Sequence, residues 1–204
     1  MFNCDCCYLY IYDVYVKGGR RLETSELQTL LHNLDNQTQQ AGNNINALSG
    51  EINNLYSQAE NCRATADSLL NRAVLEEDAN RSADMASQAS AYLSRAEYYE
   101  SSAAQMESQV EELRGELRGY RHEYEYYMGE GETNLANLEI AVNKLTRLTG
   151  AKYGGDKIRQ TLEQTRHRIV FNRKLVEGCK KRINWIDRIC GNAGGQPVKR
   201  YTLH

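Results

Sequence analysis

Three cysteines near the N-terminus are the residues whose types and spacing come closest to a chemical site. Cys4, Cys6 and Cys7 stand within four positions, and His204 ends the chain. Three thiolates and one imidazole are ligands that tetrahedral zinc accepts. These residues would meet only if the two ends of the chain pair, and Cys-x-Cys-Cys is tighter than the usual zinc-ligand spacing. We favour the alternative, a plain lead-in to a strand with no cofactor, and keep zinc as the second interpretation.

No familiar catalytic pattern accompanies these cysteines. The four histidines form no His-Glu-x-x-His pair, and the sequence has no Gly-x-Ser-x-Gly motif. The glycine-containing stretch 150–157 lacks the spacing and the Lys-Ser/Thr pair of a phosphate loop, so we expect a hinge there. Carboxylates are common, but nothing places two of them in the apolar cleft that general acid–base catalysis needs. The sequence therefore predicts a protein that is not an enzyme.

Basic residues gather in the last quarter of the chain. Residues 1–150 hold 12 Lys and Arg against 23 Asp and Glu, whereas residues 151–204 hold 13 against 4. One interpretation is a nucleic-acid-binding module, because these cations could follow a phosphate backbone and a tryptophan could stack on a base. The interpretation we favour is that they face the acidic stretch 97–139 within one bundle. The candidate nucleic-acid residues are Arg166, Arg168, Arg173, Lys174, Lys180, Lys181, Arg182 and Trp185.

Tyrosine is the third unusual feature. The chain has 14 tyrosines against two phenylalanines and one tryptophan. A tyrosine suits a surface where a partner buries the ring while the hydroxyl stays hydrated, which is the chemistry of protein interfaces. We therefore expect protein partners and a homo-oligomer. The expected interface residues are Tyr8, Tyr10, Tyr12, Tyr120, Tyr124, Tyr126 and Tyr127.

Apolar seams predict the helices that must position these residues. Apolar or small residues recur in alternating steps of three and four over 27–73, 86–127 and 158–190, which is typical of coiled coils. The middle seam contains one irregular step, a stammer at Leu93, Ala96 and Tyr99. The first two seams have matched lengths, which favours a hairpin turning near 78–82; one continuous helix is the alternative. We expect Gly129-Glu130-Gly131 to end the second helix and a short third helix to follow.

A strand is expected at the N-terminus, where apolar and tyrosine side chains alternate over residues 8–16. A lone strand must pair, and residues 198–203 are the other strand-like segment. The predicted fold class is mainly α: an elongated helical hairpin or antiparallel coiled-coil bundle with a small β element from the N-terminal strand and a C-terminal strand as candidate partner. The predicted segments are a cysteine-rich segment with the strand (1–19), long coiled-coil helices (20–128), a short helix with a glycine hinge (129–155), a basic coiled-coil helix (156–190) and a tail (191–204).

The stretch LETSELQTLLHNLDNQTQQAGNNINALSGEINNL, residues 22–55, resembles the opening helix of WXG100/LXG-type proteins associated with type VII secretion. The Ala/Glu/Tyr-rich helix that follows is similar to coiled coils that accompany polymorphic-toxin loci. This resemblance implies a helical hairpin and a role as an accessory or adaptor of a secretion or toxin-type system. Residues 76–82 lack the Trp-x-Gly of the WXG100 turn.

These patterns together predict a non-enzymatic coiled-coil scaffold, adaptor or assembly subunit that self-associates. No stretch approaches the roughly 20 apolar residues of a membrane-spanning helix, and no basic-then-apolar leader begins the chain. We therefore expect a soluble, cytoplasmic protein with no membrane partner, with signal-less export as the alternative. The six cysteines are too sparse for a secreted disulfide scaffold of this length, so reduced thiols are expected.

Overall fold

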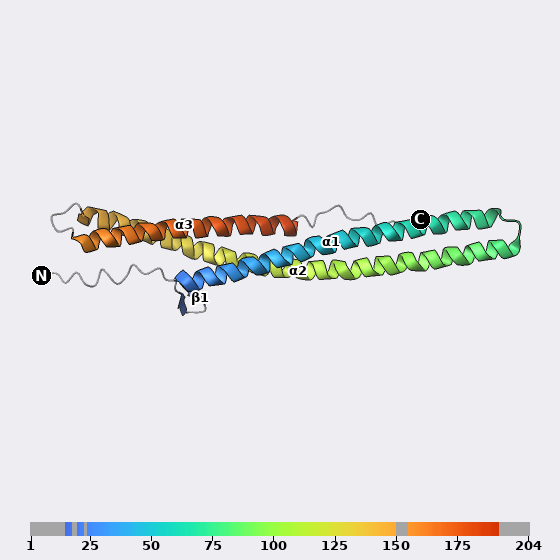
Figure 1. Cartoon of the computed structure of the whole chain (residues 1–204), viewed down its shortest axis with the longest axis horizontal. Coiled ribbons are helices and arrows are strands. Elements are labelled where there is room, and N and C mark those ends of the chain that lie inside the picture. The colour runs from blue at the N-terminus through green and yellow to red at the C-terminus, as the bar shows by residue number, and fades with distance from the viewer. Residues whose placement is uncertain (1–14, 18–19, 23, 150–154, 192–204) are drawn as a thin grey trace. The chain divides into compact units, whose positions relative to one another are not determined.

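The computed structural model describes residues 15–17, 20–22, 24–149 and 155–191, and this part of the chain is almost entirely helical. The helices are α1 (Thr24–Leu75), α2 (Ala79–Thr149) and α3 (Asp156–Gly191), preceded by the short segments β1 (Tyr15–Lys17) and β2 (Arg20–Leu22) (Figure 1). The chain divides into two compact units. We call Gln39–Glu116 the hairpin unit, and Met1–Thr38 with Leu117–His204 the three-helix unit.

The expected terminal β element is not supported. Within the described residues, β1 pairs antiparallel with β2, and Tyr15 lies opposite Leu22. The predicted partner at 198–203 and most of the predicted strand at 8–16 lie outside the described residues. Pairing inside one short segment closes a far smaller loop than joining the two ends of the chain, and so costs less conformational entropy.

In the hairpin unit, α1 and α2 run antiparallel and hold each other through a thin seam. The Tyr56 hydroxyl donates to Glu107 Oε1 at 3.0 Å, and the Arg63 guanidinium donates to both carboxylate oxygens of Glu100 at 3.0 and 2.8 Å. Small side chains in a seam let two helices approach closely. Near the turn, buried alanines recur every seven residues within each helix: Ala59, Ala66 and Ala73 on α1, and Ala89, Ala96 and Ala103 on α2.

The turn between these helices lies at residues 76–78, slightly before its predicted place, and it rules out one continuous helix. Asp78 caps α2, because its Oδ1 accepts hydrogen bonds from the backbone N–H groups of Asn80 (2.8 Å) and Arg81 (3.2 Å). The Ser82 hydroxyl donates to the carbonyl oxygen of Ala73 at 2.8 Å and so ties the start of α2 to the end of α1. Side-chain capping therefore makes this turn without glycine or proline.

The predicted helix break at 129–131 is wrong, because α2 continues to Thr149. Buried and half-buried residues follow one unbroken alternation of three and four from Met85 through Tyr92, Tyr127 and Gly131 to Leu145. Tyr92 fills the place at which a stammer was expected, so the irregular step is also wrong. Gly131 occupies a seam position, where a Cβ atom would lie 2.9 Å from side-chain atoms of both Leu175 and Val176. This glycine makes room for α3; it does not end the helix.

The three-helix unit packs the start of α1 and the end of α2 against α3. Its seams contain three polar residues that the structure buries, Thr38, Thr165 and Asn172. Each bonds to a carbonyl oxygen one turn earlier in its own helix, at 2.6, 2.7 and 3.0 Å respectively, so burial leaves these groups satisfied. The apolar core of this unit comprises Leu27, Leu34, Leu117, Tyr124, Tyr127, Leu138, Leu145, Leu162, Leu175, Val176, Cys179, Ile183 and Ile186.

None of the helices over the described ranges combines the length and apolar character needed to cross a membrane.

Candidate protein-interaction site

The predicted metal ligands Cys4, Cys6, Cys7 and His204 lie outside the described residues. Among residues 15–17, 20–22, 24–149 and 155–191, no three His, Cys, Asp or Glu side chains gather closely enough to hold a metal ion. The buried Cys179 belongs to the α3 seam, where burial and then the negative charge of Asp35 raise the pKa of its thiol to about 12. A thiol with so high a pKa stays protonated and is a poor nucleophile or metal ligand.

The structure corrects the interface prediction for two of the tyrosines. Tyr124 and Tyr127 are only 2% and 1% exposed, because they fill the core of the chain's own three-helix unit. Tyr126 lies on the outer side of α2 with its ring edge-on to Tyr127, at a centroid distance of 5.4 Å. Tyr120 is half-buried. The remaining predicted interface residues, Tyr8, Tyr10 and Tyr12, lie outside the described part of the chain.

One carboxylate oxygen joins all three helices of the three-helix unit. Oδ1 of Asp35, on α1, accepts a hydrogen bond from the Tyr124 hydroxyl of α2 at 2.6 Å. The same oxygen accepts from Arg182 Nε of α3 at 2.8 Å. We call these three residues the Asp35 junction. Burial, and then the hydrogen bond to Asp35, raise the pKa of Tyr124, so the phenol remains a proton donor and cannot serve as a base near neutral pH. The junction therefore joins the three helices through hydrogen bonds to a single carboxylate oxygen.

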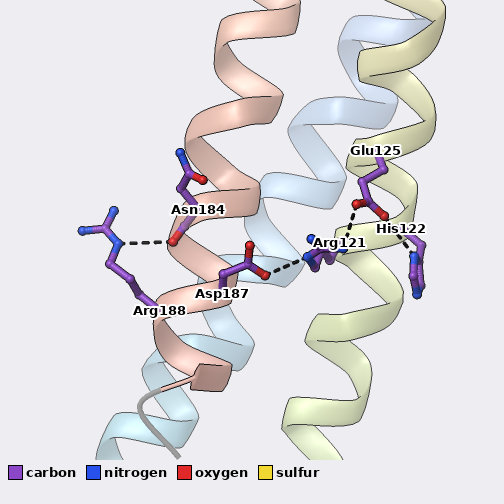
Figure 2. A network of polar contacts seen from close by, with 6 residues as sticks. All are labelled: Arg121, His122, Glu125, Asn184, Asp187 and Arg188. Atoms are coloured by element: carbon purple, nitrogen blue, oxygen red, sulfur yellow. Dashed lines mark hydrogen bonds and ion pairs between the residues drawn. The ribbon is translucent and has the colours of Figure 1, made fainter.

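A second polar network locks α2 to α3 near the end of α3. Arg121 Nε donates to Asp187 Oδ1 at 2.7 Å, and Arg121 Nη1 donates to Glu125 Oε1 at 2.7 Å. His122 Nδ1 lies 3.1 Å from the other oxygen of Glu125. Figure 2 shows Arg121 between the two carboxylates. Arg188 of α3 is directed to its own helix, where its Nε donates to the carbonyl oxygen of Asn184 at 3.2 Å (Figure 2).

Several residues of α3 that were predicted to bind nucleic acid form ion pairs with glutamates of the same chain. Between helices, Arg173 contacts Glu139 at 3.1 Å and Lys180 contacts Glu132 at 2.9 Å. The expected pairing of α3 with the acidic stretch 97–139 is therefore seen at these two glutamates. Within α3, Arg166 pairs with Glu163 and Lys181 with Glu177. Of the other candidates, Arg182 belongs to the Asp35 junction, Lys174 is exposed, and Arg168 and Trp185 are half-buried.

The hairpin unit contains a groove between α1 and α2 that is lined by two carboxylates among apolar and amide side chains. Glu112 and Glu116 are its only ionisable lining residues, so no basic or nucleophilic group stands beside them. The other lining residues are Asn44, Ala47, Leu48, Gln109 and Leu113.

Large apolar side chains outside the seams are the surface feature that the sequence interpretation missed. Val74 and Leu75, at the end of α1, are 84% and 82% exposed. Val170 on α3 and Ile140 on α2 also present about half of their surface. The sequence pattern could have identified Val74 and Leu75. Ala73 is the last seam residue of α1, so the large apolar residues directly after it must point away from the seam. Exposed apolar side chains that gather at one place are typical of docking surfaces.

Comparison with other proteins adds no family assignment. No protein-family model, curated protein or solved structure matches the chain, so only its own surfaces bear on its function.

Proposed function

We propose that the protein is a non-enzymatic coiled-coil scaffold or assembly subunit that binds protein partners and self-associates. The observation that carries this proposal is the end of the hairpin unit, where a capped helical turn presents Val74 and Leu75 to solvent. A stable helical hairpin can present apolar side chains at a fixed place with little loss of conformational entropy on binding. Leaving two such side chains in water has no benefit for folding, which favours a role in association.

The state of the ionisable groups also supports a non-enzymatic role. Asp35, Tyr124 and Arg182 satisfy one another, and Arg121 is held between Asp187 and Glu125. A catalytic acid or base needs a pKa close to the working pH and access to a substrate. Burial raises the pKa values of Tyr124 and Cys179, both core residues, so these two groups stay protonated near neutral pH.

Mass measurement over about a hundredfold range of protein concentration tests the proposal, because a dimer with micromolar affinity becomes populated within such a range. We expect the weight-average mass from sedimentation equilibrium or light scattering to rise above that of a single chain. A single-chain mass at every concentration would contradict self-association.

The alternative function is nucleic-acid binding by α3. It is favoured by the exposed outer side of α3, where Arg166, Lys174 and Lys181 extend into solvent. Titration with duplex and single-stranded DNA and RNA over a series of salt concentrations tests this alternative, since phosphate contacts make affinity fall steeply with salt. Binding that disappears when Lys174 and Lys181 are changed to Glu would support it. Absence of binding at low salt would reject it.

A further inference from the structure

The turn between α1 and α2 combines exposed apolar side chains with acidic charge. Val74 and Leu75 stand at the end of α1, and Leu70, one turn earlier, is also exposed. The carboxylates of Glu76, Glu77, Asp78 and Asp84 outnumber the guanidinium groups of Arg72 and Arg81 in the same segment. We call residues 70–84 the hairpin tip; Figure 1 shows it as the connection between α1 and α2.

The outer side of α3 carries a surface of the opposite charge. Val170 is 51% exposed, although it lies on a helix whose seam residues are buried. Residues three and four positions away on a helix are its surface neighbours. For Val170 these four neighbours are all basic and all exposed: Arg166, His167, Arg173 and Lys174. We call these five residues the Val170 patch. Arg166 and Arg173 each also pair with one glutamate, Glu163 and Glu139 respectively, so the cations still outnumber the carboxylates at this place.

We propose that the hairpin tip of one copy docks on the Val170 patch of a second copy. Val74 and Leu75 would cover Val170, while Glu76 and Glu77 would approach the basic neighbours of Val170. This inference rests on the proposed function, since it specifies which surfaces carry self-association.

Charge complementarity selects this pairing over the other contacts between copies. Two hairpin tips brought together would oppose acidic groups with acidic groups, and two Val170 patches would oppose basic groups with basic groups. The groove lined by Glu112 and Glu116 is also acidic, so it does not suit the hairpin tip. The tip and the patch combine apolar contact with opposite charge.

The contact is heterologous, because it joins two different surfaces. Every open oligomer then keeps one unused tip and one unused patch, so association continues beyond a dimer unless a ring closes. The contact involves few apolar side chains and belongs among small interfaces, below about 1,200 Å², which are weak. We therefore expect assembly to depend strongly on protein concentration.

A mixing experiment with two variants of the full chain tests the proposal. Val74→Ser combined with Leu75→Ser disables the tip without adding charge, and Val170→Asp disables the patch by placing a carboxylate opposite the acidic tip. Each variant alone should associate at least about tenfold more weakly than the unchanged chain, because the apolar contacts are lost. Because these positions are exposed, folding should persist, and circular dichroism checks the helix content. Ser101→Asp, an exposed position on α2 of the hairpin unit, is the matched control and should leave association unchanged.

An equimolar mixture of the two disabled variants provides the decisive measurement. One variant retains an intact patch and the other an intact tip, so they should form one-to-one dimers that grow no further. Association of either variant alone at the original strength would overturn the inference while leaving the proposed self-association standing, and a mixture that stays monomeric would also overturn it. A monomeric unchanged chain would contradict the proposed function itself.

Charge reversal supplies a second, independent arm. Glu76→Lys with Glu77→Lys should weaken association at least about tenfold, because these lysines would meet the basic patch. Arg166→Glu with Lys174→Glu, introduced into the same chain, should restore it. Failure of this second pair to restore association would show that the two surfaces do not meet.

Discussion

Gly131 provides the sharpest test of how α2 and α3 pack. A Cβ atom at this position would lie 2.9 Å from both Leu175 Cδ2 and Val176 Cγ2, whereas carbon atoms in good contact are about 3.5–4.0 Å apart. Leu175 and Val176 are themselves buried, and the branched side chain of Val176 has little rotamer freedom. Gly131→Ala must therefore displace these side chains or separate the two helices.

Two opposing effects set the size of the change. Overpacking a well-packed core costs about 1–3 kcal/mol, whereas alanine is better than glycine inside a helix by about 1 kcal/mol. Gly131→Ala should therefore lower the free energy of unfolding by up to about 2 kcal/mol.

Gly129, two residues earlier in α2, is the matched control. Apart from its chain neighbours and the nearby backbone of α2, nothing lies within 4 Å of a Cβ atom built at Gly129, so Gly129→Ala should raise the free energy of unfolding by about 1 kcal/mol. The propensity gain is common to both variants, so the difference between them isolates the clash.

Urea unfolding followed by the fluorescence of Trp185 reads this difference. Trp185 is the one tryptophan of the chain and lies on α3, so its signal reports on the three-helix unit. We expect the unfolding midpoint to be higher for Gly129→Ala than for the unchanged chain, and lower for Gly131→Ala than for Gly129→Ala. Equal stabilisation by the two substitutions would refute the close approach of α2 and α3 at Gly131.

Three further predictions concern pH, capping and an ion pair. Folding raises the pKa of Tyr124, and raises that of Cys179 from about 9 to about 12, so the folded state keeps protons that the unfolded state loses. The free energy of unfolding should therefore fall as pH rises above about 9. Cys179→Ala should flatten this slope in urea titrations at several pH values. Asp78→Ala should destabilise the start of α2 by about 1 kcal/mol, read as faster hydrogen exchange in its first turn, whereas Asp78→Asn should keep most of the cap. The ion pair between Arg63 and Glu100 is partly exposed, so a double-mutant cycle should give it less than about 1 kcal/mol of the free energy of unfolding, and less still at high salt. A larger coupling energy that does not change with salt would contradict this.

The sequence predicted the helices well because their seams obey a simple period. The residues expected to be buried on α1 and α3, from Leu27 to Ala73 and from Ile158 to Cys190, are buried or half-buried. The hairpin turn was placed within a few residues, because the matched lengths of the first two seams required a reversal between them. Alternation of three and four thus identifies both a helix and its inner face.

The errors arose where a residue's role depends on what lies against it. Gly131 has the type of a helix breaker, yet its seam position and the side chains of α3 give it a packing role. Tyr124 has the type of an interface residue, yet Asp35 from another helix provides the partner for its hydroxyl. Such roles depend on tertiary contacts, which propensity and composition do not contain. Val74 and Leu75 differ from these cases, because the seam period identifies only the buried side of α1 and both residues lie off that side.

The alanine repeat of the hairpin unit has a consequence for how the two helices find their alignment. Because alanines recur every seven residues on both α1 and α2, sliding one helix by a heptad, about 10 Å, would match alanines with alanines again. The alanine part of the seam therefore discriminates weakly between such slipped pairings. The short 76–78 connection cannot span the added distance, and Asp78 fixes where α2 begins. The capped turn thus acts together with the Tyr56–Glu107 and Arg63–Glu100 contacts to select one alignment, and inserting seven residues there would remove its share of that selection.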